Sequence, residues 1–166
     1  MVLEHQTHMH NYIARLNFEA TIAMKTYGHV NYLKSIVEGF VRYMLFAEEA
    51  PLTAKVTGTS TFQQDFEKLG PRDSKGRSLR KLDLSERMFK YPCSYLIYSE
   101  AFEALPTALK EKIYARLFDV LTGKDTSETY EFLSSESRRA ILEILAETKC
   151  DLPDHWKKAV NSKSSS

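Results

Sequence analysis

Hydrophobic residues recur every three or four positions through most of the chain, and this spacing predicts α-helices. The expected helices cover Val2 to about Tyr27, Val30 to about Glu49, a short stretch from 62 to 69, Cys93 to about Leu105, Ala108 to Leu121, and Ser135 to Thr148. No run alternates apolar and polar residues as a strand does. The pattern therefore predicts an all-α fold, with about five or six helices in an irregular bundle.

Breaker residues mark the expected ends of these helices. Gly28 interrupts the pattern after the first helix, and Pro51 is expected to end the second. Gly123 is expected to cap the end of the helix over 108–121. The first helix should bury one apolar stripe, made of Met9, Tyr12, Ile13, Leu16, Ala20, Ala23, Met24 and Tyr27. The stretch from 51 to 85 is the least regular and contains one long basic loop.

The length of 166 residues suits a single helical domain over 1–160, followed by a disordered, serine-rich tail over 161–166. Trp156, in "DLPDHW", is expected to anchor the end of the domain in the core. No apolar run approaches the ~20 residues that span a bilayer. The 23 basic and 22 acidic residues nearly balance, so the composition indicates no binding of nucleic acid.

Nucleophilic chemistry has little support in the sequence, and an enzyme is the less favoured class. Cys93 and Cys150 lie in no recognised pair motif, so two free thiols are expected rather than a disulfide. Cys93 follows a proline where a helix can begin, but no histidine lies near it in sequence to act as its base. No Ser-His-Asp arrangement has a signature in this chain.

The densest candidate chemistry is "EHQTHMHN", which spans residues 4 to 11. Successive residues of an α-helix are about 100° apart, so His5 and Met9 are about 40° apart, in the middle of the apolar stripe. His8 lies at the border of the stripe, one turn from Glu4, and His10 lies on the other side. The three histidines therefore do not meet at one metal on a regular helix. The zincin pattern is also absent, because Met9 stands where its second histidine would be.

Two interpretations of the inward residues remain open. His5 and Met9 can both ligate iron, so either could be an axial ligand of a haem lying against this helix, and His5 could also hold a metal. Alternatively, His5 is a core histidine that is hydrogen-bonded to a neighbour, and Met9 is packing.

A second candidate is the basic loop, which we define as residues 70–81, "GPRDSKGRSLRK". It gathers Arg72, Arg77 and Arg80 around Asp73, and such a loop can hold an anionic or protein partner through guanidinium and backbone N–H donors. It lacks the spacing of a phosphate-binding Walker loop. Arginine bridges to helix ends would explain the same composition, so both interpretations stay open.

Several long strings resemble a known family: "MVLEHQTHMHNYI", "FAEEAPLTAKVTGTSTFQQDFEKLGPRDSKGRSLRKLDLSERMFKYPCSYLIYSEAFEALP" and "LSSESRRAILEILAETKCDLPDHW". They are similar to the C-terminal portion of large, largely uncharacterised, exported bacterial proteins that resemble c-type cytochromes. In that family the haem-attachment motif Cys-x-x-Cys-His lies upstream. The resemblance covers nearly the whole chain, from about Met1 to Trp156.

The resemblance implies a non-catalytic C-terminal module that packs on a haem-bearing upstream domain or subunit. His5 and His10 match the "EHQ…HN" pattern of the family, which favours His5 as a site residue. The "GPRD…GRSLR" string also matches, so Arg72, Asp73, Arg77 and Arg80 are expected beside the haem-bearing part.

Cofactor and location follow from the same resemblance. The two cysteines do not form the haem-attachment motif, so this chain is expected to carry no covalent haem; a haem c would belong to the upstream region. The protein would then be periplasmic. Because residues 1–10 do not read as a signal peptide, a chain that truly starts at Met1 is expected to stay in the cytoplasm.

Overall fold

The computed structural model describes residues 1–162 and is built from helices and loops, which confirms the all-α prediction. The described part of the chain contains seven α-helices and three short 3-10 helices, slightly more than predicted. The α-helices are α1 (Val2–Tyr27), α2 (Lys34–Met44), α3 (Phe62–Lys68), α4 (Glu100–Glu103), α5 (Thr107–Leu121), α6 (Ser135–Thr148) and α7 (His155–Ser162); the 3-10 helices are η1 (Asn31–Leu33), η2 (Tyr95–Tyr98) and η3 (Glu128–Tyr130).

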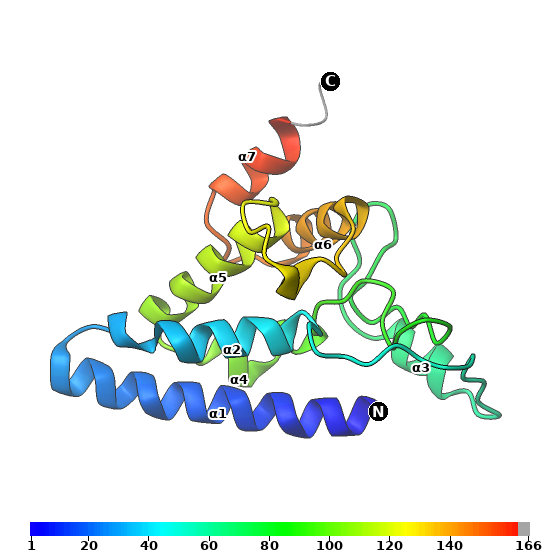
Figure 1. The fold of residues 1–166 in the computed structure, drawn as a ribbon, viewed down its shortest axis with the longest axis horizontal. Helices are drawn as coiled ribbons and strands as arrows, with labels where there is room; N and C mark the ends of the chain where they lie inside the picture. Colours follow the sequence, from blue (N-terminus) through cyan, green and yellow to red (C-terminus); the bar gives the residue numbers. More distant parts are fainter. Residues whose placement is uncertain (163–166) are drawn as a thin grey trace.

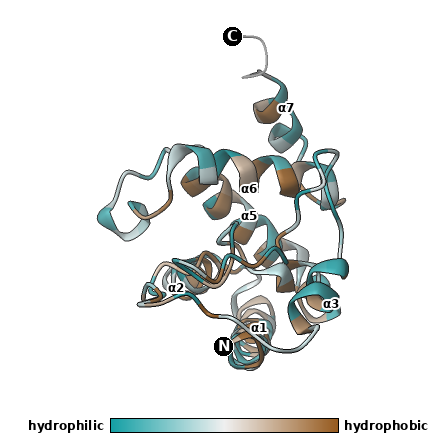
Figure 2. Cartoon of the chain, turned by 90° about the vertical axis from the view of Figure 1, so that its right-hand side faces the viewer, coloured by the Kyte–Doolittle hydropathy of each residue, from teal (hydrophilic) through white to brown (hydrophobic). Residues whose placement is uncertain are grey.

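The helices are arranged in successive layers. α1 lies along one edge of the molecule and packs on α2 and α4; α2 packs on α5, α5 on α6, and α6 on α7 (Figure 1). Figure 2 shows α1 almost end-on at that edge, with α2 and α3 above it on either side. Buried side chains from these helices form one continuous core. The outer side of α1 is left uncovered, and Leu3 and Phe18 are exposed there.

The first helix follows its predicted bounds. Its buried side includes His5, Met9, Ile13, Leu16, Ala20 and Ala23, as the spacing predicts. Gly28 ends it in the left-handed conformation, with φ 72°, and its N–H donates to the carbonyl of Met24. The predicted stripe is wrong in the last turn of α1, where Met24 and Tyr27 are exposed.

The second helix is shorter than predicted. η1 precedes it, and α2 ends at Met44 rather than near Pro51. Phe46 adopts a left-handed backbone with φ 58°, and the N–H of Ala47 returns to the carbonyl of Arg42 at 3.0 Å. This C-terminal turn stops the helix before proline is reached.

The predicted helix from Cys93 to Leu105 is instead two short pieces, η2 and α4. Ser94 accepts a hydrogen bond from the N–H of Leu96, and Ser99 accepts one from the N–H of Phe102. Each serine has an extended backbone and caps the turn that follows it. The two caps therefore divide a segment that the apolar spacing predicts as one helix. The short helix α3 lies within the range predicted for it.

The C-terminal part matches the prediction through α6 and departs from it afterwards. α5 and α6 have the expected bounds to within a residue, and Trp156 is completely buried, which confirms it as an anchor. Residues 161 and 162 belong to α7, so the predicted tail is wrong there; residues 163–166 lie outside the described part. Cys93 is a buried free thiol and Cys150 an exposed one, as expected for unpaired cysteines.

Candidate functional site

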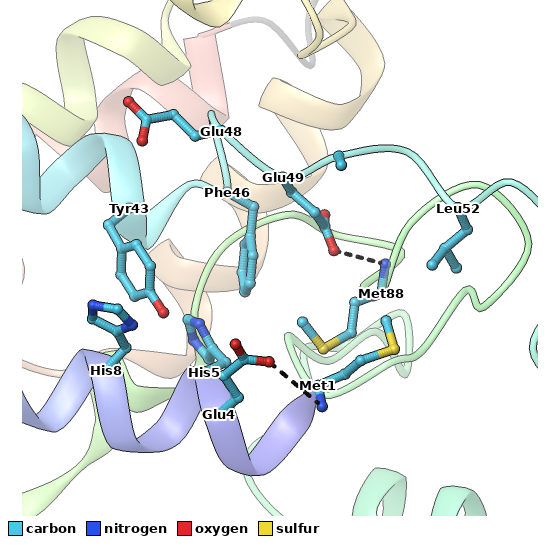
Figure 3. Close-up of a pocket in the computed structure, with 11 residues that line it drawn as sticks. Met1, Glu4, His5, His8, Tyr43, Phe46, Glu48, Glu49, Leu52 and Met88 are labelled. Carbon is cyan, nitrogen blue, oxygen red and sulfur yellow. Dashed lines mark hydrogen bonds and ion pairs between the residues drawn. The ribbon is translucent and has the colours of Figure 1, made fainter.

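The candidate site is a pocket between the start of α1 and the loop that follows α2 (Figure 3). Its volume is about 520 Å³. We call it the α1 pocket; its lining residues are Met1, Glu4, His5, His8, Tyr43, Phe46, Glu48, Glu49, Ala50, Leu52 and Met88. The helical spacing of α1 brings His5 and His8 to the same side of the pocket, while α2 and its following loop supply the opposite wall.

His5 forms part of the pocket wall and is 4% exposed. Its Nε2 lies 2.8 Å from the hydroxyl oxygen of Ser94, which also accepts from the N–H of Leu96. Burial, and then the charge of His8, lower the pKa of His5 to about 4, so the ring is neutral. Either atom can donate in the contact between Nε2 and Ser94; the other ring nitrogen, Nδ1, has no partner among residues 1–162 and is open to the pocket.

Aromatic rings surround the two imidazoles. The ring of His5 lies 4.6 Å from that of Phe46 and 5.4 Å from that of Tyr43. His8 is exposed at the mouth of the pocket, with its ring 5.3 Å from Tyr43. Figure 3 shows Tyr43 and Phe46 extending from the opposite wall toward the two histidines of α1. The wall is therefore apolar and aromatic, with one imidazole enclosed and one accessible.

Three carboxylates give the pocket its charge. Glu4 and Glu48 are at the exposed rim, where Glu4 lies 4.0 Å from the ammonium group of Met1 and Glu48 pairs with Arg42. Glu49 lies deeper and accepts a hydrogen bond from the N–H of Met88 at 3.1 Å. Burial raises the pKa of Glu49, and the hydrogen bond from Met88 opposes that shift.

The other residues predicted around His5 lie outside the pocket. Met9 is completely buried in the core, and His10 is exposed and does not line the pocket. An iron could reach Met9 only if α1 moved away from its neighbours. Among the described residues, no group of three or more His, Cys, Asp or Glu side chains is placed to hold a metal ion. A metal at His5 would thus need ligands from elsewhere.

The basic loop lies away from the α1 pocket and is held by internal contacts. Arg77 donates to Asp73 and to Glu143 of α6, each at 2.7 Å. Arg72 donates to the carbonyl oxygens of Glu67 and Gly76. The guanidinium of Arg80 lies over two rings, 4.8 Å from the centre of Phe66 and 4.2 Å from that of Tyr95.

The carboxylate of Asp73 accepts from the backbone N–H groups of Lys75 and Arg77, and its side chain is fully buried. All four predicted loop residues are therefore engaged within the chain. An external anion would have to compete with these contacts for Arg72, Arg77 and Arg80.

Cys93 does not have the environment of a nucleophile. Its thiol is completely buried, and burial raises its pKa to about 12. No helix in the described part of the chain is both long and apolar enough to cross a membrane.

Sequence reasoning did not identify Ser94, Tyr43, Phe46 or Glu49 as parts of the site. Ser94 and Phe46 lie far from His5 in sequence, and only the folded chain brings them to it. His8 was assigned to the edge of the stripe, which is correct, but its place at a pocket depends on Tyr43 of α2. The aromatic "YMLF" and acidic "EE" in "YMLFAEE" were the only local signal for this wall.

The fold and the pocket define a helical protein with a ligand-sized, acidic and aromatic site. Comparison with protein-family models, with curated proteins and with solved structures gave no match to this chain. The resemblance to cytochrome c-like proteins therefore stays a prediction.

Proposed function

We propose that this chain is a non-catalytic helical module that packs on a haem-bearing protein region through the face around the α1 pocket. The observation that carries the proposal is the pair of imidazoles at this pocket, one exposed and one in its wall. The family resemblance of the surrounding strings supports a haem protein as the partner. Such a module would act in the periplasm, where c-type haem proteins are assembled.

The residues of the pocket suit the iron of a haem better than its propionate groups. An exposed imidazole is a good axial ligand for iron, and His8 has that exposure. Three carboxylates do not suit the haem propionates, which are negatively charged too. The haem therefore stays in the partner, where it supplies one-electron transfer, and this chain contributes a neighbouring surface.

His8 is the imidazole of the pocket that a partner can reach without a rearrangement. His5 already uses Nε2 for Ser94, and Met9 lies within the core. The earlier candidates, His5 and Met9, would require α1 to shift. His10, exposed on the same helix but outside the pocket, is a matched control.

The proposal can be tested with a haem peptide that carries Cys-x-x-Cys-His, leaves one axial position open and is acetylated at its amines. We expect the chain to convert its absorption spectrum to that of six-coordinate, low-spin iron. The change should be lost with His8→Ala and kept with His10→Ala and Met9→Ala. Loss with His5→Ala alone would support an inner ligand and a mobile α1. An unchanged spectrum with the wild-type chain contradicts the proposal.

The alternative function, a free-standing module that binds a protein or anionic partner through the basic loop, has less support. Arg72, Asp73, Arg77 and Arg80 all have partners within the chain. These internal contacts explain why the loop is basic: its arginines hold it in place, and Arg77 binds Glu143 of α6.

A further inference from the structure

We infer that the α1 pocket receives an alkylammonium group, the side chain of a lysine on the surface of a protein partner. This deepens the proposed function: the identity of that partner as a haem protein rests on it, whereas the chemistry of the pocket does not. The inference depends on three features of the pocket, namely its charge, its aromatic wall and its continuity with the surface of α1.

The charge of the lining residues is one-sided. Glu4, Glu48 and Glu49 contribute carboxylates, of which Glu48 already pairs with Arg42, and the lining itself contains no lysine or arginine. His5 adds no positive charge because burial keeps its ring neutral. Glu49, the least exposed of the three, gains most from a cation in a desolvated position.

The walls suit the stem of a lysine as well as its charge. Tyr43 and Phe46 present aromatic rings, over which an ammonium is favoured. Leu52 and Met88 provide apolar surface that can cover a four-carbon chain. A purely hydrophilic cation would leave this apolar surface uncovered, so the shape and chemistry favour a group that is apolar along its length and charged at its end.

The imidazole of His5 offers an occupant a polar contact besides the carboxylates. His5 is 4% exposed, lines the pocket, and leaves one ring nitrogen without a partner among the described residues. Where that nitrogen carries the hydrogen of the neutral ring, it can donate to an acceptor of an occupant. A lysine residue offers that acceptor in its backbone carbonyl, while its ammonium reaches the carboxylates.

The surroundings favour a protein over a free amine. A second hollow adjoins the pocket and shares Met1, Glu4 and His8 with it. It extends along α1 to Leu3, Thr7 and Asn11, and Leu3 is 74% exposed. The pocket thus opens onto a partly apolar helix face, with Glu4 at its border, on which a macromolecular surface can rest.

The test is a titration of the ¹⁵N-labelled chain with acetyl-Gly-Lys-Gly-amide, followed by NMR. Acetyl-Gly-norleucine-Gly-amide, which lacks only the charge, is the matched control, and n-butylammonium represents a free amine. We expect the lysine peptide to shift the amide signals of Tyr43, Phe46 and Glu49, with binding that weakens at least threefold as salt rises. The norleucine peptide should leave these signals in place. Equal shifts with both peptides overturn the inference, and binding of n-butylammonium alone overturns the assignment to a protein lysine.

Variants locate the binding. Glu49→Gln keeps the shape of the side chain and should weaken binding of the lysine peptide at least fivefold. Glu4→Gln changes an exposed side chain and should also weaken binding. Glu131→Gln, at an exposed residue outside the pocket, should have no effect. Unchanged affinity in both pocket variants overturns the inference.

The outcomes for the two proposals are separable because the haem peptide has no free amine. If the haem peptide binds and the lysine peptide does not, the inference about lysine is wrong and the haem proposal stands. If only the lysine peptide binds, the pocket chemistry stands and the haem partner is wrong.

Discussion

At the residue scale, the burial of His5 links the free energy of unfolding to pH. The imidazole is enclosed by Phe46, Tyr43 and Ser94, and its pKa in the folded chain is about 4, against an ordinary value of 6.5. The titratable side chains that share the pocket with it are Glu4, His8, Tyr43, Glu48 and Glu49. As pH falls, the unfolded chain takes up a proton at this site before the folded chain does.

We therefore expect the free energy of unfolding to fall as the pH is lowered from about 6.5 to about 4, by roughly 3 kcal/mol if the full shift is expressed. The contribution of His5 is complete above pH 6.5. Urea unfolding at several pH values will measure it, with His5→Gln as the comparison, since an amide can still bond Ser94. The wild type and His5→Gln should differ in slope over this window, and parallel curves would contradict the assignment.

At the scale of elements, an ionic network fastens the basic loop to α6. Glu143 accepts from Arg77 and Lys75, while Arg139 of its own helix binds its other oxygen. Burial raises the pKa of Glu143, but the hydrogen bonds from Lys75, Arg139 and Arg77 outweigh it and hold that pKa at about 2. The carboxylate of Glu143 is thus charged in the folded chain at any pH well above 2.

Two cations of this network allow a matched comparison. Arg77 is 18% exposed and also binds the buried Asp73, whereas Lys75 is 61% exposed. Arg77→Ala should lower the free energy of unfolding by about 3 kcal/mol, because it leaves Asp73 and Glu143 partly unpaired in a desolvated place. Lys75→Ala should cost less than about 1 kcal/mol, as exposed ion pairs do. Urea unfolding at neutral pH measures both; equal, small losses would mean that the loop is not held by this network.

The elements also differ in how well the sequence predicts them. The burial of His5 and Met9 could be predicted from α1 alone, because a long amphipathic helix repeats its inward face regularly. Between Cys93 and Leu105 the same spacing misleads, because Ser94 and Ser99 cap two separate turns. Local hydrogen bonds of serine there outweigh the apolar period.

The candidate site was predictable only in part, for a related reason. Its histidines come from one helix and were placed correctly by helical geometry. Its opposite wall needs Tyr43, Phe46 and Met88, which come from two other segments. Phe46 turns toward His5 because the backbone ends α2 with a positive φ there. No periodicity in the sequence indicates such a turn at a phenylalanine.

At the scale of the whole molecule, the core is continuous from α1 to α7. α1 contacts α2, and the contacts continue through α5 and α6 to α7. Trp156 joins the last helix to this core: it is completely buried, and its ring lies 5.3 Å from that of Phe118 in α5. No layer of the described chain has a core separate from the rest.

A continuous core should unfold cooperatively, and the chain offers a simple probe of this. Trp156 is the only tryptophan and reports on α7, while far-UV circular dichroism reports mainly on the longer helices α1, α5 and α6. We expect both signals to change at the same urea concentration, with one midpoint and one slope, because the loss of α7 would uncover Phe118 and loosen α5. An earlier fluorescence transition would mean that α7 detaches first, because its contacts through Trp156 and Val160 would then be too weak to couple it to the core. Repeating the comparison with Arg77→Ala separates the two cases, because a coupled α7 will follow the shift in midpoint and an independent one will not.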